Sequence, residues 1–147
     1  MKLSSKSRYA TRALLDLAIH SNGTPVLLRD IAHRQQISLP YLEQLVAPLK
    51  AGGLIRSIRG TKGGILLAKH AEDIRLSEVI HLLEGSTSLV DCVNDPSLCD
   101  RSEFCVTRDI WEELKMAIDG VLESTTLHDL AERQKRKKPP EKSMYYI

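Results

Sequence analysis

The first half of the chain constrains the fold most, because it presents four recognisable pieces in a fixed order. Two short helical patterns come first, one starting near Ser5 and one covering residues 28–36. A third helix begins at Ser38, whose hydroxyl suits the cap position, and Pro40 follows where a missing amide costs little. Two short apolar runs on either side of the glycine-rich segment 60–64 then indicate a hairpin. This order predicts a winged helix-turn-helix, which is a DNA-binding motif.

The second half predicts further helices over residues 76–85 and 127–132, the latter capped by Thr126. Between them, residues 107–124 carry an apolar stripe at helical spacing, formed by Ile110, Leu114, Ile118 and Val121. Such a stripe can fold back on its own domain or pack against a second copy. A two-fold DNA-binding dimer needs an element of the second kind. We therefore predict a mainly α fold, a winged helix-turn-helix domain with a long C-terminal dimerisation helix.

The chain length fits one folded domain, which we expect to cover residues 1–131. Its parts would be a DNA-binding region at 1–71, a cysteine loop at 91–106 and the dimerisation helix at 107–124. The basic tail at 132–147 is nearly free of apolar residues before its last four, so we expect it to be disordered. The chain shows neither an 18-residue apolar run nor a secretory signal, which predicts a cytoplasmic protein without membrane contact.

Charge is strongly segregated along the chain. Residues 1–71 hold eleven Lys or Arg and three acids, whereas residues 72–132 hold four Lys or Arg and fifteen acids. A charge that merely solvates a surface would not separate the signs by segment. The basic first half therefore indicates a polyanionic partner, which for a winged helix-turn-helix is double-stranded DNA with a palindromic operator.

The third helix and the hairpin supply the candidate DNA contacts. The opening turns of the helix would face base edges, and Glu43 could accept a hydrogen bond from a cytosine amino group or simply pair with a nearby cation. Arg59 at the hairpin tip suits a narrow minor groove, because the adjacent Gly60 lets the backbone approach DNA closely. The other candidates would contact phosphates or lie beside Glu43 on the third helix, which is called here the reading helix. The full set is Lys6, Arg8, Ser38, Tyr41, Glu43, Gln44, Lys50, Arg59, Gly60 and Lys62.

Cys92, Cys99 and Cys105 are the only cysteines, and they share one short loop. In a reducing compartment, clustered thiols indicate metal or redox chemistry rather than structural disulfides. Structural zinc sites commonly contain a C-x2–4-C pair, which is absent here, while iron–sulfur clusters accept irregularly spaced thiolates. The spacing alone favours a cluster over zinc, with thiol redox chemistry or chance as the remaining alternatives.

Three features together resemble the IscR/NsrR/CymR group of bacterial winged-helix transcription regulators. They are YLEQL, the glycine-rich SIRGTKGG, and the cysteine loop that ends in CVTRDIW. The resemblance extends over residues 1–131 and implies a homodimer that binds DNA under the control of an iron–sulfur cluster. IscR-like members hold a two-iron, two-sulfur cluster and NsrR-like members a four-iron cluster, and the resemblance favours the two-iron form here.

The familiar fourth ligands are missing from this chain. At the position where IscR-like proteins place a histidine ligand stands Arg108, and at the position of the NsrR-like aspartate stands Arg8. A protonated guanidinium has no lone pair to offer a metal. The fourth position would then be open, or filled by an exogenous thiol or by an acid of the loop, the candidates being Asp91, Asp100 and Glu103.

The C-terminal MYYI resembles the end of CymR-like regulators, which bind a cysteine-synthase enzyme through their tail. The sequence thus predicts a transcription regulator and not an enzyme, acting as a repressor of iron–sulfur assembly or sulfur metabolism genes. One alternative is a CymR-like repressor of cysteine metabolism that works through a protein partner. Others are a zinc-stapled interaction protein and a thiol oxidoreductase, although no C-x-x-C motif supports the latter.

Overall fold

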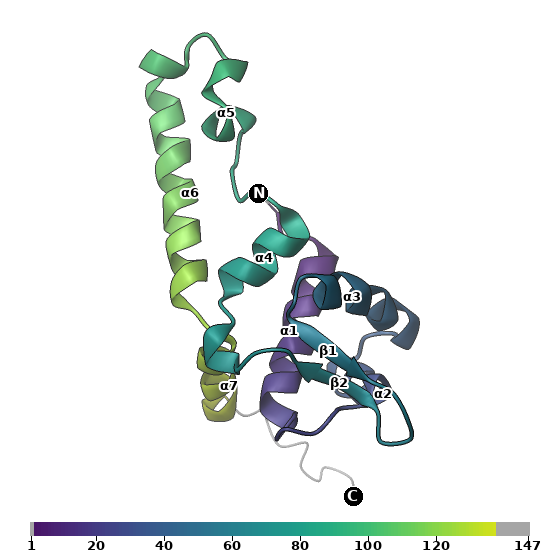
Figure 1. Cartoon of the computed structure of the whole chain (residues 1–147). Helices are drawn as coiled ribbons and strands as arrows, with labels where there is room; N and C mark the ends of the chain where they lie inside the picture. Colours follow the sequence, from purple (N-terminus) through teal and green to yellow (C-terminus); the bar gives the residue numbers. More distant parts are fainter. Residues whose placement is uncertain (1, 138–147) are drawn as a thin grey trace, which may run out of the picture.

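The computed structural model describes residues 2–137, which are mainly helical with one two-stranded hairpin (Figure 1). The α-helices are α1 Ser5–His20, α2 Leu28–Gln35, α3 Leu39–Ala51, α4 Leu76–Glu84, α5 Asp91–Asn94, α6 Val106–Ser124 and α7 Leu127–Arg136. The strands are β1 Ile55–Ile58 and β2 Gly64–Leu67, and short 3-10 turns form at Ala71–Asp73, Pro96–Leu98 and Ser102–Phe104. The predicted mainly α winged helix-turn-helix fold with a long helix after the cysteines is confirmed.

Side-chain caps stabilise the first turns of α3 and α7 at the positions that the sequence predicted. The Ser38 hydroxyl accepts a hydrogen bond from the Tyr41 amide at 3.3 Å, which satisfies one free donor of the first turn of α3. Thr126 and Asp129 exchange side-chain to backbone hydrogen bonds at the start of α7. The helix α3 continues past its interior Pro48 to Ala51.

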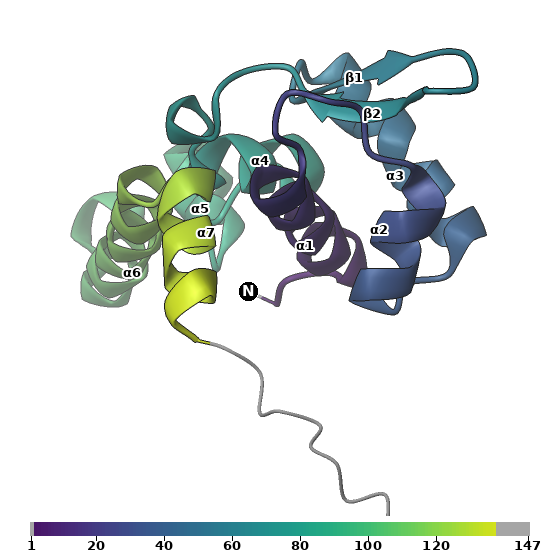
Figure 2. The same ribbon diagram turned by 90° about the horizontal axis from the view of Figure 1, so that it is seen from below.

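The central helix of the body is α1, which contacts α2, α3, α4, α7 and β2 (Figure 2). Its apolar stripe is buried, and one core joins it to the helix-turn-helix, the hairpin and the later helices. The core residues of largest volume include Leu14, Leu17, Ile31, Leu42, Leu45, Leu54, Ile55, Ile74, Val79 and Leu127. The reading helix α3 is therefore held by the same core that holds α4 and α7.

A buried ion pair fixes α2 against α1. The carboxylate of Asp16 on α1 is fully buried and accepts two hydrogen bonds from Arg34, at 2.7 and 3.0 Å, and one from Gln35 at 3.0 Å. Arg12 adds hydrogen bonds to the backbone carbonyl and the side chain of Gln35. The hydrogen bond to Asp16 raises the pKa of Arg34. These contacts set the position of α2, which leads directly into α3.

A glycine is required where the hairpin packs against the segment before α2. The strands pair antiparallel from Ile55 opposite Leu67 to Ile58 opposite Gly64. Backbone hydrogen bonds between Val26 and Ile65 attach the hairpin to the segment before α2. A side chain on Gly64 would collide with the backbone of Val26. Close backbone approach therefore explains this glycine of the SIRGTKGG motif.

The long helix α6 leaves the body and extends along one side of the molecule, with α5 beside its far end (Figure 1). None of the α6 residues is buried in the single chain. Its start and end, Val106 and Ser124, agree with the prediction to within one residue. No helix among residues 2–137 is both long and apolar enough to cross a membrane.

The last helix, α7, is longer than predicted. It was expected to end near residue 132 but continues to Arg136, so the first residues of the predicted tail are helical. Leu127 and Ala131 anchor it in the core, and three basic residues occupy its last turn, where they complement the negative end of the helix dipole. The rest of the tail, including the MYYI end, lies outside the described residues.

Candidate DNA-binding surface and cysteine loop

The exposed face of α3 carries the predicted reading residues. Glu43, Gln44 and Lys50 are all exposed, on the side of the helix away from the core residues Leu42 and Leu45. None of the ion pairs in the described part of the chain involves Glu43. Ser38 is also exposed, but its hydroxyl already serves as the cap of α3. This face can offer a carboxylate, an amide and an ammonium group to a DNA groove.

Tyr41 has a structural contact that the sequence did not indicate. Its ring meets the ring of Tyr9 on α1 edge to face, with centroids 5.7 Å apart. The guanidinium groups of Arg8 and Arg12 lie 5.8 and 5.3 Å from the Tyr9 centroid, within the range of a cation–π contact. Tyr41 therefore helps to orient α3 against α1, and a contact between Tyr41 and a base stays a prediction. The contact between Tyr9 and Tyr41 was missed because it joins two helices.

The hairpin tip exposes the other predicted contacts. Arg59, Gly60 and Lys62 are all exposed, and Gly60 has a φ of 109°, a conformation that favours glycine. Lys6 and Arg8 are exposed at the start of α1. The cations predicted to contact DNA thus lie at the surface of α1, α3 and the hairpin, where an anionic partner could reach them.

The three cysteines lie at different points of the cysteine loop. Cys92 is on α5, Cys99 follows a 3-10 turn, and Cys105 is the residue that precedes α6. All three are free thiols; Cys92 and Cys105 are half-buried and Cys99 is exposed. Within residues 2–137, no three His, Cys, Asp or Glu side chains lie together in the arrangement of a metal site. The three thiols are thus on one loop, but their side chains are not grouped as the ligands of a metal site would be.

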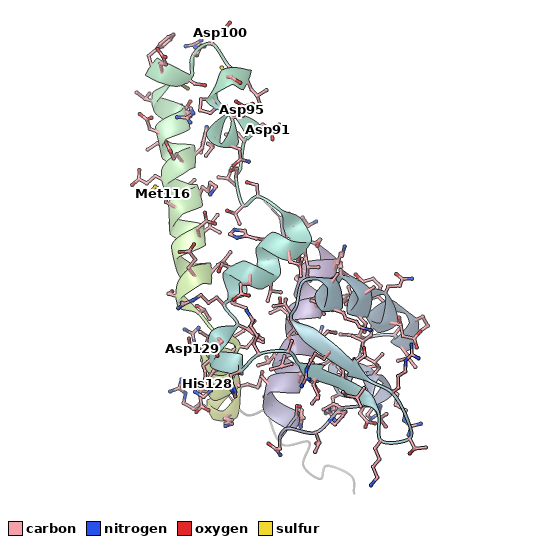
Figure 3. All side chains as sticks on the ribbon, in the orientation of Figure 1. Asp91, Asp95, Asp100, Met116, His128 and Asp129 are labelled. Carbon is pink, nitrogen blue, oxygen red and sulfur yellow. The ribbon has the colours of Figure 1, made fainter. Side chains whose placement is uncertain are left out.

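Acidic side chains are distributed over the same loop. Figure 3 shows Asp100 at the tip of the loop, with Asp91 and Asp95 beside α5. Asp91, Asp100 and Glu103 are exposed, and within residues 2–137 none of them is part of an assembled group of three possible metal ligands. Asp95 is engaged locally, because its carboxylate accepts hydrogen bonds from the backbone and side chain of Ser97 at 3.1 and 2.6 Å.

Hydrogen bonds fix part of the loop. The buried hydroxyl of Ser102 lies 2.8 Å from the Pro96 carbonyl and 2.9 Å from the Cys99 carbonyl. Arg108 on α6 donates from Nε to the carbonyl of Cys92 at 3.0 Å, which ties α5 to α6. Arg108 therefore anchors the backbone of α5 to α6.

The thiol of Cys105 lies at the positive end of α6. Its Sγ is 3.2 Å from the hydroxyl of Thr107, and that hydrogen bond, together with the Arg108 backbone amide, lowers the pKa of Cys105. Three unpaired thiols on one exposed loop fit the donor chemistry of an iron–sulfur cluster. The loop would have to draw them together around the cluster, and Arg108 does not supply a fourth donor.

The apolar stripe of α6 remains uncovered in the single chain. Ile110, Leu114 and Val121 are 51%, 42% and 65% exposed, and Ile118 is half-buried. The stripe borders a shallow apolar groove whose lining also includes Leu3. The stripe therefore does not fold back into the core of its own domain, which was one of the two possibilities left open by the sequence.

Known proteins that are similar to this chain are transcription regulators. The family profile described as "Rrf2: Iron-dependent Transcriptional regulator" matches residues 3–133. The protein rrf2 of Nitratidesulfovibrio vulgaris strain Hildenborough is 45% identical over 130 residues, which are 88% of this chain and 87% of that protein.

Two solved structures share the fold at substantial sequence identity. CymR, the global cysteine regulator of B. subtilis, superposes with a TM-score of 0.79 and 36% identity, covering 91% of this chain and 98% of the other. IscR of T. potens superposes with a TM-score of 0.75 and 39% identity, covering 95% and 93%. The predicted membership of the group that includes IscR and CymR is confirmed. The chain is a DNA-binding transcription regulator of the Rrf2 family, not an enzyme.

Proposed function

We propose that the chain is a homodimeric repressor whose operator binding is controlled by an iron–sulfur cluster on Cys92, Cys99 and Cys105. The observation that carries the proposal is the position of these thiols, on the segment that joins α4 of the DNA-binding body to α6. A cluster formed there would order the connection between the helix-turn-helix and hairpin of each subunit, called here the reading head, and α6, called here the dimer helix. The genes controlled would be those of iron–sulfur assembly or sulfur metabolism, and the favoured cluster is the two-iron, two-sulfur form.

The uncovered stripe of α6 supports the proposed homodimer. Pairing two copies along Ile110, Leu114, Ile118 and Val121 would remove exposed apolar surface from water. It would also fix the separation of two reading heads, and that separation must match the half-site spacing of a palindromic operator. A change at the cysteine loop could then alter DNA affinity by moving the heads relative to α6.

Each reading head would use its exposed groups in different ways. Glu43 and Gln44 would contact base edges, with Tyr41 and the cap residue Ser38 beside them. Arg59 and Gly60 would enter the minor groove. The remaining cations would contact phosphates and position the protein without reading sequence, and they are Lys6, Arg8, Lys50 and Lys62.

The test is to measure iron and sulfide per subunit after anaerobic reconstitution of the wild type and of each single Cys→Ala variant. Ser97→Ala, in the same loop but without a thiol, is the control. We expect a brown wild type and control, and loss of cluster in each cysteine variant. Full cluster content in any cysteine variant would remove that residue from the ligand set. A colourless, zinc-loaded wild type would favour the zinc-stapled interaction protein.

The CymR-like alternative is favoured by one observation, the superposition on the B. subtilis global cysteine regulator. In this version the regulator would act through an enzyme partner resembling cysteine synthase, bound by the tail, and the thiols would hold no cluster. A pull-down of such an enzyme by the full chain, but not by a chain shortened at residue 143, would support it. Iron and sulfide in the same purified protein would argue for the cluster instead.

A further inference from the structure

The segment between α4 and the cysteine loop is attached to α6 by a buried hydrogen bond. The side chain of Thr87 donates to Oδ1 of Asp119 at 2.5 Å, and Thr87 is only 1% exposed. Asp119 is the partner that satisfies this buried hydroxyl, and no buried side-chain nitrogen or oxygen of residues 2–137 is left without a hydrogen bond. Breaking the bond would leave a buried polar group unpaired.

Asp119 also connects to α4 and to its own helix. Its Oδ2 accepts from Lys115 at 2.6 Å, and its Oδ1 lies 3.5 Å from Nε2 of His81 on α4. Burial opposes the ionisation of Asp119, but the hydrogen bonds from Lys115 and Thr87 outweigh it and lower the pKa of Asp119. One carboxylate thus joins α4, the segment after α4, and α6.

A second anchor lies at the other end of the same segment. Arg108 holds the carbonyl of Cys92, and Asp119 holds the side chain of Thr87. Between the two anchors the chain is folded rather than extended, because Asn94 at the end of α5 hydrogen-bonds to the hydroxyls of Ser86 and Ser88 at 2.6 to 3.1 Å. Ser86 and Ser88 flank Thr87, so a displacement of α5, which carries Cys92, acts on Thr87 through both of its neighbours.

Contacts of α4 connect Asp119 to the helix-turn-helix. His81 is on α4, whose residues Val79 and Ile80 are buried against the body. The last residue of α4, Glu84, accepts hydrogen bonds from the backbone and hydroxyl of Ser4 at 2.8 and 2.7 Å, directly before α1. Since α1 contacts both α2 and α3, a shift of α4 relative to α6 changes the position of the helix-turn-helix relative to the dimer helix.

We propose that Asp119, through its hydrogen bond to Thr87, is the positioning residue that transmits the state of the cysteine loop to the DNA-binding body. The inference rests on the proposed function, since it names the contact by which a cluster on the loop affects operator binding. Asp119 would touch neither the cluster nor DNA. Its effect would be on the ratio of operator affinities with and without the cluster.

The test compares Thr87→Val, which removes the hydroxyl but keeps the shape, with Thr87→Ser, which keeps the hydroxyl. Asp119→Ala is the second disrupting variant, and Glu113→Gln, an exposed acid on the same helix, is the control. In the metal-free proteins, amide exchange over residues 86–90 should accelerate about tenfold in Thr87→Val and Asp119→Ala. Thr87→Ser and the control should exchange as the wild type does.

The second readout is the ratio of operator Kd values without and with the reconstituted cluster. The ratio should fall toward one in both disrupting variants, while their iron content stays at the wild-type level and Thr87→Ser keeps the full ratio. Variants that retain the ratio within twofold would overturn the inference. A wild-type ratio of one would instead refute the proposed cluster control, and the coupling with it, whereas unchanged exchange over 86–90 refutes the anchor alone.

Discussion

The buried pair between Asp16 and Arg34 gives a prediction that can be worked out from its geometry. Arg34→Met removes two hydrogen bonds, at 2.7 and 3.0 Å, from a carboxylate that is 0% exposed. Removing one partner of a fully buried pair costs about 3–5 kcal/mol, because the remaining charge has no compensation. Here a third of the Arg34 side chain is exposed, and Gln35 keeps its hydrogen bond to Asp16. We therefore expect a loss of about 2–3 kcal/mol.

The measurement is urea unfolding at one fixed protein concentration, since dimerisation would make the midpoint concentration-dependent. A double-mutant cycle with Asp16→Asn isolates the pair, because an amide at position 16 no longer leaves a buried charge behind. The double variant should be more stable than the sum of the single losses predicts, by about 1–2 kcal/mol. A loss below about 0.5 kcal/mol in Arg34→Met, the range of surface changes, would refute the reasoning. Strict additivity would refute it equally.

Three further predictions concern the dimer, base reading and acid stability. Leu114→Asp combined with Ile118→Asp should yield monomers by light scattering that no longer bind the operator, and a variant that stays dimeric would contradict the α6 interface. Glu43→Ala should relax discrimination at one base pair by about 1–3 kcal/mol in a binding-site selection, whereas Lys62→Ala should weaken all sequences alike and reduce the salt dependence. Hydrogen bonds from Ser7 and Ser4 at the start of α1 lower the pKa of Glu84 below the ordinary value for a glutamate. Because the pKa of Glu84 is lower in the folded protein than in the unfolded chain, its ionised carboxylate stabilises the fold at pH values above the unfolded pKa. This stabilisation is lost as the pH falls through the folded pKa, so Glu84→Gln should reduce the loss of stability on acidification below pH 4.5.

Local sequence signals predicted those parts of the fold that depend on local physics. Ser38 and Thr126 are caps in the structure because a hydroxyl at that position satisfies amides within the same turn. The glycines of the hairpin were recognisable from the turn they form. The end of α7 was misplaced, because a run of basic residues looked like a solvated tail although Lys and Arg are good helix formers.

The contacts that cross between elements could not be predicted from one sequence. Asp16 and Arg34 are separated by 18 positions, and nothing in their spacing indicates that the carboxylate is buried. Tyr41 was interpreted as a base contact because it begins the reading helix, yet its ring also packs on Tyr9. The anchor from Arg108 to the Cys92 carbonyl joins residues 16 positions apart. Such pairs depend on tertiary packing, which overrides local preference.

The most direct test of cluster control is the operator Kd of a single protein preparation before and after anaerobic cluster assembly. Both measurements use the same salt concentration, because affinity for DNA depends strongly on it. We predict that assembly produces visible absorbance, with iron and sulfide bound by the three thiolates, and that it changes the operator Kd by at least about fivefold, the lower end of typical allosteric coupling. A protein that assembles the cluster but binds the operator with unchanged Kd, or that takes up no iron and sulfide at all, would contradict the account.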